Sequence, residues 1–515
     1  MKKADLILLS DSIFTATGKP AFKGYVALKD GMILSVGEGD VDQTLIDDQT
    51  TCMELGNKTV TPAFSDVHCF FTGYSVGFVG VGLENAETVE DLVHEAKKYS
   101  LEIPEEKTVL GHGWNPELIK PEGTALLDEA FKDRPVILFA AGCETCFMNQ
   151  AAIDKYQFTP DTCWPESYVR LLPDLLTDRD FIVPEFKRYM KMMNSRGITS
   201  VKEMGFDQFY GFTDILKDLE ENKELTLRVS FMSQPVAEPT NLAYGKAMRE
   251  KFQGEFVRFS GYNQMTDGSI SQICGDLKEP YLCADTTCAQ EINWQLLADD
   301  ARAVDAEGFR FSLHAQGDAA ISKVLDIYES CKRDENGRLI NRHSITDLEF
   351  SDPEDLERMG RLGAIAEIYP QIQSIADREG KLSMISEKIG MERGKYYWNR
   401  RKMADSGVLL SCGTDLPLLI DDIPESIYHG VGGYFPEGGE PFNKQNMLTV
   451  EELLTAWSKG GAYNLFQENE LGTLEPGKKA DLVIFTENLF EVPLEDVRRV
   501  KVAKTFLNGA IVHEL

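Results

Sequence analysis

The sequence has little of several features that would direct it to particular partners. No apolar stretch is long enough to cross a bilayer, so we expect no membrane span. Basic residues are few: 53 Lys and Arg stand against 84 Asp and Glu, for a net charge of −31. Because such a surface repels phosphate backbones and anionic lipids, we expect neither nucleic acid nor a membrane as a partner. A small-molecule substrate is the remaining expectation.

Signals for export are also missing. Only four apolar residues, 6–9, follow the lysines at the start, fewer than the apolar core of a signal peptide needs. The ten cysteines are scattered, and a chain of 515 residues can bury a large core without disulfides. We therefore expect a cytoplasmic protein with free thiols. Cys143 and Cys146 have CxxC spacing, but with no second pair we interpret it as incidental.

The two ends of the chain resemble each other and differ from the middle. Ala4-Asp5-Leu6-Ile7-Leu8 near the start is echoed by Ala480-Asp481-Leu482-Val483-Ile484 near the end. Each is followed by a hairpin signal, Asp30-Gly31 in one case and Asn508-Gly509 in the other. Each end alone has too few strands to bury a face. We therefore predict one small β-sandwich built from both ends, residues 1–60 and 470–515.

Between the ends, short apolar runs alternate with helical patterns, as in a parallel α/β barrel. We predict that residues 61–469 form a TIM-like (β/α)8 barrel. A further apolar segment, 256–260, leaves the strand count open by one. The predicted strands are 61–68, 135–140, 198–203, 227–232, 309–314, 344–348, 364–369 and 408–414.

The chemistry of such a barrel lies at the carboxyl ends of its strands. His68 and His314 end predicted strands, and Asp415 follows an apolar strand in which a lone carboxylate is costly without a partner. Two imidazoles and a carboxylate suffice for a catalytic zinc with a position for water, and equally suit an iron(II) triad. We predict one divalent metal, zinc by preference, held by His68, His314 and Asp415. Asp415 would also accept a proton. Ordinary loop contacts would explain each residue singly.

Other polar and aromatic residues are candidates for substrate contact. Side chains alternate along a strand, so Phe70 should share a face with His68, where a second histidine would have made a two-imidazole clamp. Lys202-Glu203 is interpreted as an ion pair, 267–269 as a turn, and His343 as a residue at the far end of the barrel. The residues predicted to contact substrate are Phe70, Trp114, Glu144 and Asp347.

Several motifs together match a known pattern. The most specific are His314-Ala315-Gln316-Gly317-Asp318 and the closing segment Gly472-Thr473-Leu474-Glu475-Pro476-Gly477-Lys478-Lys479-Ala480-Asp481-Leu482. Segments 60–68, 111–115 and 413–415 add to them. The chain resembles the amidohydrolase superfamily, in the branch called amidohydrolase family 3 that includes N-substituted formamide deformylases. The resemblance implies a TIM-like barrel, a split β-sandwich and hydrolysis of a C–N bond.

The sequence also departs from that family. Of the family's His-x-His motif, this sequence retains only the first histidine, His68, and has Phe70 in the place of the second. Asp347 stands where the family usually has a ligand histidine. Glu144 replaces the histidine of an Asp-Gly-His loop, and Arg258 corresponds to a lysine that is often carboxylated to bridge two metals. These differences argue against a binuclear centre. If a single metal is bound instead, Asp347 is a further oxygen ligand for it.

The leading hypothesis is a hydrolase of an amide-like, non-peptide C–N bond in a small molecule, with a homodimer as the expected assembly. One alternative is a metal-independent enzyme in which Glu144, Asp347 and Asp415 perform acid/base chemistry. Another is a non-catalytic small-molecule-binding protein, since a fold does not dictate function. Metal content separates the first hypothesis from the others, and turnover separates the second from the third.

Overall fold

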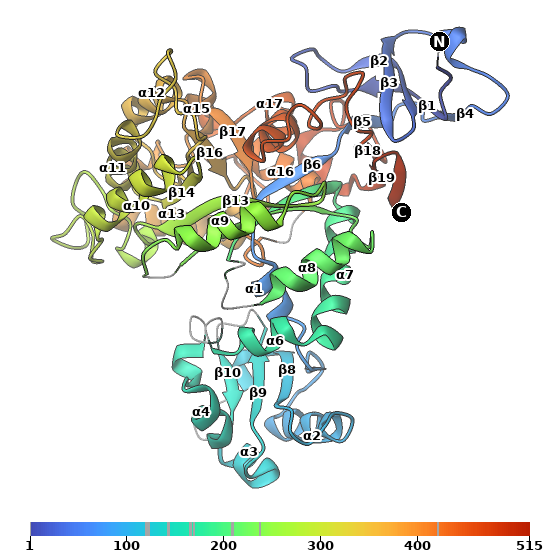
Figure 1. Ribbon diagram of the computed structural model, residues 1–515. Helices are drawn as coiled ribbons and strands as arrows, with labels where there is room; N and C mark the ends of the chain where they lie inside the picture. Colours follow the sequence, from blue (N-terminus) through green and yellow to red (C-terminus); the bar gives the residue numbers. More distant parts are fainter. Residues whose placement is uncertain are drawn as a thin grey trace. The chain divides into compact units, whose positions relative to one another are not determined.

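The described residues form two compact units in the computed structural model (Figure 1). The first comprises Met1–Cys69, Met190–Gly205 and Leu219–Leu515, and the second Phe70–Tyr189 and Phe206–Asp218. The structure describes the whole chain except residues 1, 119–123, 142–144, 164–166, 168–169, 206, 208–210, 236–237 and 420–421.

The first unit contains a parallel sheet of eight strands that curls into a barrel. Asp415 N–H donates to the His68 carbonyl at 2.8 Å, and Cys69 bridges to Leu416, so the two outer strands of the sheet meet. Every residue of the first strand is buried, as expected when helices cover a parallel sheet. In barrel order the strands are β6 (Phe64–Cys69), β11 (Ile198–Glu203), β12 (Arg228–Ser233), β13 (Val257–Met265), β14 (Arg310–Ala315), β15 (Ser344–Asp347), β16 (Ile365–Ile368) and β17 (Leu409–Cys412).

One predicted barrel strand lies elsewhere. Segment 135–140 contains β9 (Val136–Ala140), which belongs to a four-stranded sheet of the second unit with β7 (Val81–Gly82), β8 (Val109–Trp114) and β10 (Cys146–Met148). Segment 256–260, which had left the count open, begins the fourth barrel strand, β13. The assignment of 135–140 to the barrel was wrong because an apolar run reveals a buried strand without revealing its sheet.

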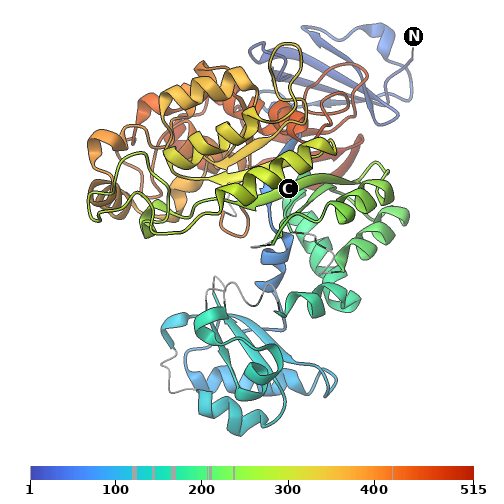
Figure 2. The same cartoon turned by 60° about the vertical axis from the view of Figure 1, so that its left-hand side comes forward.

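Helices follow the barrel strands and lie along their outer side (Figure 2). Local signals set their limits: α12 begins after Asp352, whose side chain accepts from a backbone N–H, and ends at Gly363 with φ 74°. The helices between β12 and β18 are α9 (Leu242–Lys251), α10 (Trp294–Ala306), α11 (Asp318–Glu329), α12 (Pro353–Leu362), α13 (Arg378–Lys388), α14 (Met391–Gly394), α15 (Arg400–Asp405), α16 (Ile423–Gly430), α17 (Val450–Thr455) and α18 (Gly461–Asn464).

Both chain ends contribute to a second eight-stranded sheet of this unit. β5 lies between β1 and β18, and leads directly into the first barrel strand. Leu8 and Val26 from one end share a core with Leu482 and Phe506 from the other. The strands are β1 (Leu6–Ile13), β2 (Phe22–Lys29), β3 (Met32–Glu38), β4 (Thr51–Glu54), β5 (Thr59–Pro62), β18 (Leu482–Phe485), β19 (Val502–Leu507) and β20 (Ala510–Glu514).

The second unit packs helices on its own four-stranded sheet. Leu92, Val109, Leu138 and Phe147 belong to its core. Among the described residues, no helix of either unit combines the length and the hydropathy of a membrane span. The helices associated with this unit are α1 (Phe71–Val76), α2 (Val89–Ser100), α3 (Thr124–Phe131), α4 (Gln150–Tyr156), α6 (Leu172–Thr177), α7 (Arg179–Ser195) and α8 (Phe212–Glu221).

Candidate active site

Four predicted residues lie at the carboxyl ends of barrel strands. His68 is on β6, His314 on β14 and Asp347 at the end of β15. Asp415 follows β17. Because the strands are parallel, their carboxyl ends meet at one mouth of the barrel. The four side chains form two pairs there, each of a histidine and an aspartate.

The first pair is His68 with Asp415. Nε2 of His68 lies 3.6 Å from Oδ1 of Asp415. Tyr369 packs edge-on against the imidazole, with ring centroids 5.4 Å apart. Gly413 makes the close approach of the two strands possible, since a Cβ at that position would lie 2.7 Å from the Cβ of His68. Backbone packing and an aromatic contact therefore hold this pair.

The second pair is His314 with Asp347. Nε2 of His314 lies 3.0 Å from Oδ2 of Asp347, and Gln316 Nε2 donates to the same oxygen at 2.8 Å. On the opposite edge of the ring, Nδ1 lies 3.5 Å from Oδ1 of Asp267. That carboxylate is fixed by three backbone N–H groups at 2.8 or 2.9 Å. The turn predicted at 267–269 thus places a carboxylate behind His314.

Both imidazoles therefore lie between two carboxylates. On one side of each ring, Nδ1 of His68 is 3.6 Å from Oε2 of Glu367, and Nδ1 of His314 is 3.5 Å from Oδ1 of Asp267. On the other side, each Nε2 faces an aspartate of the mouth. Histidines that bind metals commonly donate their second ring N–H to a carboxylate. Here a carboxylate oxygen lies near Nδ1 of both histidines, at distances slightly longer than a hydrogen bond.

Burial and charge separate the pKa values in the mouth. Burial raises the pKa of Asp415 to about 6, with the charge of Asp347 adding to the rise and the two histidines opposing it. Burial lowers the pKa of His314, but the hydrogen bond and charge of Asp347 outweigh that effect and raise the pKa to about 9. At neutral pH, without a bound cation, Asp415 is an ionised base and His314 an imidazolium.

Both aspartates of the mouth have left-handed backbone conformations. φ is 79° at Asp347 and 51° at Asp415. Aspartate tolerates this region better than most residues, at some cost in energy, and such conformations are concentrated at functional sites. The conformation is thus consistent with a working role for both carboxylates.

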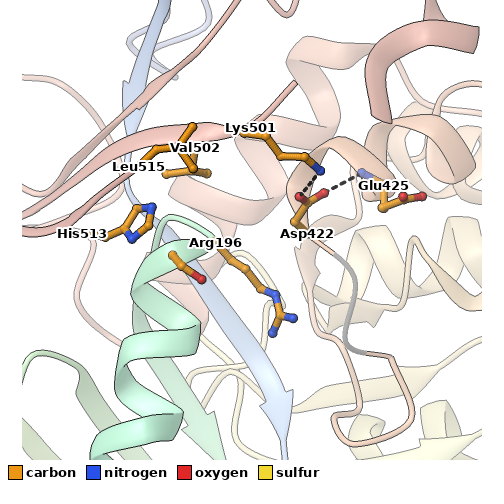
Figure 3. A pocket seen from close by; sticks show the side chains of 8 residues that line it. Arg196, Asp422, Glu425, Lys501, Val502, His513 and Leu515 are labelled. Carbon is orange, nitrogen blue, oxygen red and sulfur yellow. Dashed lines mark hydrogen bonds and ion pairs between the residues drawn. The ribbon is translucent and has the colours of Figure 1, made fainter. Parts of the chain in front are cut away.

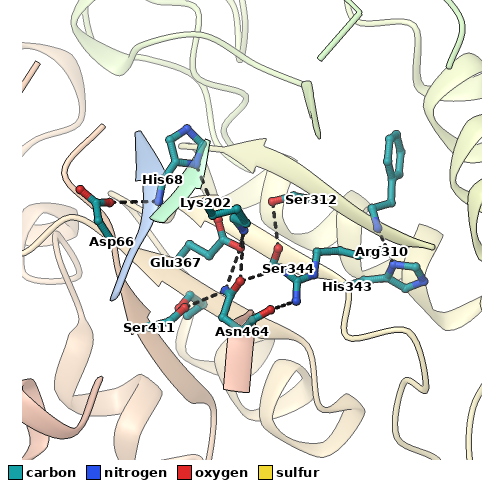
Figure 4. Close-up of polar contacts among 12 residues, drawn as sticks. Asp66, His68, Lys202, Arg310, Ser312, His343, Ser344, Glu367, Ser411 and Asn464 are labelled. Atoms are coloured by element: carbon teal, nitrogen blue, oxygen red, sulfur yellow. Dashed lines mark hydrogen bonds and ion pairs between the residues drawn. The ribbon is translucent and has the colours of Figure 1, made fainter. Parts of the chain in front are cut away.

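A buried polar network lies beneath His68 (Figure 4). Lys202 from β11 and Asn464 from α18 both donate to Oε1 of Glu367, the latter at 3.0 Å. Asn464 also accepts from Arg310 at 2.6 Å and donates to Ser411 at 3.0 Å. Burial lowers the pKa of Lys202 to about 8, although Glu367 opposes the fall. The network was not predicted from the sequence. Glu367 lies within the apolar segment 364–369, and a carboxylate there indicates a buried polar site as strongly as Asp415 does.

Two interpretations from the sequence are wrong. Lys202 forms its ion pair with Glu367 rather than with Glu203. Glu203 instead accepts a hydrogen bond from the Cys69 thiol at 3.5 Å. Arg258 lies near the start of β13, far from the mouth, where its guanidinium is one third exposed and 3.6 Å from Glu470. It therefore does not take the place of a lysine at the centre of the barrel.

Of the other three residues predicted to contact substrate, two belong to the second unit and one is not described. Trp114 is 1% exposed in the core of the second unit, and its indole N–H donates to the Leu138 carbonyl at 2.7 Å. Phe70 is the first residue of that unit and precedes α1. Glu144 lies outside the described residues. A substrate role for these three stays a prediction.

In the described part of the chain, one group brings three potential ligand atoms within 4.8 Å of one another, namely Asp305, Cys331 and His343. His343 Nδ1 accepts from the Phe311 N–H at 2.9 Å, so its proton is on Nε2, which donates to Asp305 at 3.0 Å. Burial raises the pKa of Cys331 to about 12, so the thiol stays protonated. This group, next to the start of β15, is best described as a structural contact.

A surface pocket of about 370 Å³ lies in the first unit (Figure 3). Arg196, Lys501 and His513 line it, together with Asp422, which is 3.6 Å from Lys501. None of the four mouth residues borders it. It is therefore separate from the candidate active site.

Comparison with known proteins gives one family. The family described as the amidohydrolase family matches residues 52–513. Protein LONG AFTER FAR-RED 3 of Arabidopsis thaliana is 25% identical over 539 residues, which cover 98% of this chain and 91% of the plant protein. The N-substituted formamide deformylase of Arthrobacter pascens is 20% identical over 568 residues, with 99% and 98% coverage.

The fold is shared with a solved structure. An uncharacterized metal-dependent hydrolase from Pyrococcus horikoshii OT3 superimposes with a TM-score of 0.73 at 20% identity, covering 95% of this chain and 99% of that one. The barrel and the sheet formed by both chain ends therefore belong to a known architecture.

Proposed function

Because this chain belongs to the amidohydrolase family, we propose that it hydrolyses an amide-like, non-peptide C–N bond of a small molecule, with one divalent cation bound at the barrel mouth. His68, His314 and Asp415 would hold that cation, with Asp347 as a further oxygen ligand. Zinc is the preferred metal, since imidazole and carboxylate are among its usual ligands.

The observation that carries the proposal is the carboxylate behind each imidazole. With Glu367 and Asp267 close to the Nδ1 atoms, both Nε2 atoms are left on the side of the mouth carboxylates. Two ligands of one tetrahedral zinc lie about 3.3 Å apart, and the two pairs have separations of 3.6 and 3.0 Å. The donors are therefore of the right kind, and the spacing within each pair is suitable. Among the described residues, however, no three ligand atoms of these four side chains lie within 4.8 Å of one another, so a single cation would require the two pairs to approach each other.

The residues of the chain account for the proton transfers. A bound cation would polarise the carbonyl group and acidify a water molecule. Asp415 accepts the proton of the attacking water at a carboxylate oxygen while the water oxygen bonds to the carbonyl carbon. The C–N bond then breaks, and Asp415 returns the proton to the leaving nitrogen. The products are a carboxylic acid and an amine.

The test is metal analysis combined with turnover. Protein purified without chelators should contain one equivalent of metal and hydrolyse members of a panel of N-formyl and N-acyl amines. A chelator should abolish turnover, and zinc should restore it. Two tightly bound equivalents, or full activity after chelation, would contradict the proposal.

A second candidate is a metal-independent acid/base enzyme. The 3.0 Å contact of His314 with Asp347 favours it, because the imidazolium is already satisfied without a cation. In that enzyme Asp415 is the base and His314 the acid. Turnover that survives chelation would support this candidate over the first.

We also propose that the protein acts in the cytoplasm. The nine cysteines in the described part of the chain are all free thiols, which suits a reducing compartment. Fractionation of cells that produce a tagged full-length chain tests the location.

A further inference from the structure

The two carboxylate oxygens of Glu367 have different surroundings. Oε1 accepts from Lys202 and, at 3.0 Å, from Asn464. Oε2 is buried and lacks a hydrogen-bond partner at normal distance. It lies 3.6 Å from Nδ1 of His68. A buried carboxylate oxygen that is left without a donor is costly, so a proton on Nδ1 of His68 is the group that best satisfies it.

The network beneath prevents Glu367 from turning away. Its side chain is fully buried, as are those of Lys202 and Asn464. Asn464 is fixed in turn by Arg310 at 2.6 Å and by Ser411 at 3.0 Å. The orientation of the carboxylate is therefore set by side chains from β11, β14, β17 and α18 (Figure 4).

We propose that Glu367 is a positioning residue for His68: it accepts the Nδ1–H, and so leaves Nε2 as the nitrogen that faces Asp415 and a ligand. The other tautomer would direct the Nδ1 lone pair at a carboxylate oxygen 3.6 Å away, where two negative regions repel each other. Lys202 supplies the opposite charge that a buried carboxylate requires. The proposal rests on the hydrolase function proposed above and adds a residue to it.

The first test replaces the buried ion pair. The double variant Lys202→Met/Glu367→Met removes the acceptor while keeping volume, and such replacements of buried pairs are commonly tolerated by the fold. Zinc affinity, measured by competition with a chromogenic chelator, should fall roughly 10- to 100-fold. Lys202→Met/Glu367→Gln restores an oxygen acceptor and should recover part of the affinity. Unchanged affinity in a folded Met/Met variant would overturn the proposal.

A matched control lies in the same network. Ser411→Ala removes a hydrogen bond to Asn464 at the same depth but leaves Glu367 in place. We expect its zinc affinity to equal that of the wild type. A loss equal to that of the Met/Met variant would mean that the network acts on folding alone, and would overturn the positioning role.

The second test reads the tautomer directly and needs no turnover. In metal-free wild-type protein at alkaline pH, nitrogen-15 NMR of the His68 ring, assigned by its loss in His68→Gln, should place the proton on Nδ1. A proton on Nε2 would overturn the inference. If the protein binds no metal and hydrolyses nothing, yet His68 has its proton on Nδ1, the positioning contact is supported and the hydrolase proposal fails by itself.

Discussion

Asp415 and His68 are joined twice, by main chain and by side chain, at the point where the last barrel strand meets the first. The Asp415 N–H donates to the His68 carbonyl at 2.8 Å, and the two side chains lie 3.6 Å apart. The contact that closes the barrel is therefore also half of the candidate site. Stability and activity should respond together when it is disturbed.

Asp415→Asn should abolish most activity. The amide keeps the volume of the carboxylate but cannot take a proton, and loss of such a base costs about 100- to 10,000-fold in rate. kcat and metal affinity should be measured together, since Asp415 is also a proposed ligand. Asp405→Asn is the control, because that aspartate is 61% exposed at the end of α15. Wild-type rates in Asp415→Asn would exclude this residue as the base.

The pH profile of activity distinguishes the two candidate enzymes. In the protein without metal, Asp415 has a pKa of about 6, so kcat/KM should rise with pH through that value as the base ionises. A cation beside the carboxylate lowers its pKa, so in a metal enzyme the midpoint should fall below about 6. A midpoint close to 6 would favour the metal-independent enzyme.

Metal-free protein should lose stability at alkaline pH. The pKa of His314 is about 9 in the folded protein against 6.5 when unperturbed. The contribution of the protonated imidazole to the free energy of unfolding is therefore complete below pH 6.5 and is lost as pH rises toward 9. The full contribution is about 3 kcal/mol. Urea unfolding across that range measures it.

His314→Gln provides the control for this effect. The variant has no titrating imidazole at the position, so its free energy of unfolding should be nearly flat over the same range of pH. Zinc should act in the opposite direction in the wild type and stabilise more as pH rises, because it competes with the proton for the ring. An equal decline in the variant would assign the effect to another group.

Asp481→Ala should destabilise the junction of the terminal sheet with the barrel. Asp481 pairs with Arg228 at the start of β12, and their side chains are 4% and 2% exposed. Removing one partner of a buried pair costs about 3 to 5 kcal/mol. The lower end is expected because Glu255 remains 3.5 Å from the guanidinium. Asp496→Ala, which breaks an exposed pair with Arg499, should leave urea unfolding unchanged.

Much of the fold could be predicted because its signals are local. Asp30 and Gly31 both have positive φ, as do Asn508 and Gly509, so both hairpins have the turns that their sequences predicted. The barrel strands were found from apolar runs, whereas the sheet that contains 135–140 was not. Pairing between distant segments depends on packing, which a single run of residues does not encode.

The candidate site was predicted only in its outer part. His68, His314, Asp347 and Asp415 were singled out because polar residues at the ends of apolar strands are unusual. Asp267 was interpreted as a turn, and Glu367 received no role, because their functions come from what lies opposite them in the barrel. A sequence shows that a buried charge needs a partner without showing which residue it is.

The position of β5 between β1 and β18 has a consequence for synthesis. Pro62 pairs with Leu482, so 482 − 62 = 420 residues separate the partners. At the usual rate of translation, roughly 20 to 80 seconds pass between the two. During that interval the strand that leads into His68 has an open edge, a template for unwanted pairing. Chaperones that shield nascent edges should therefore govern how much functional protein a cell obtains from this chain.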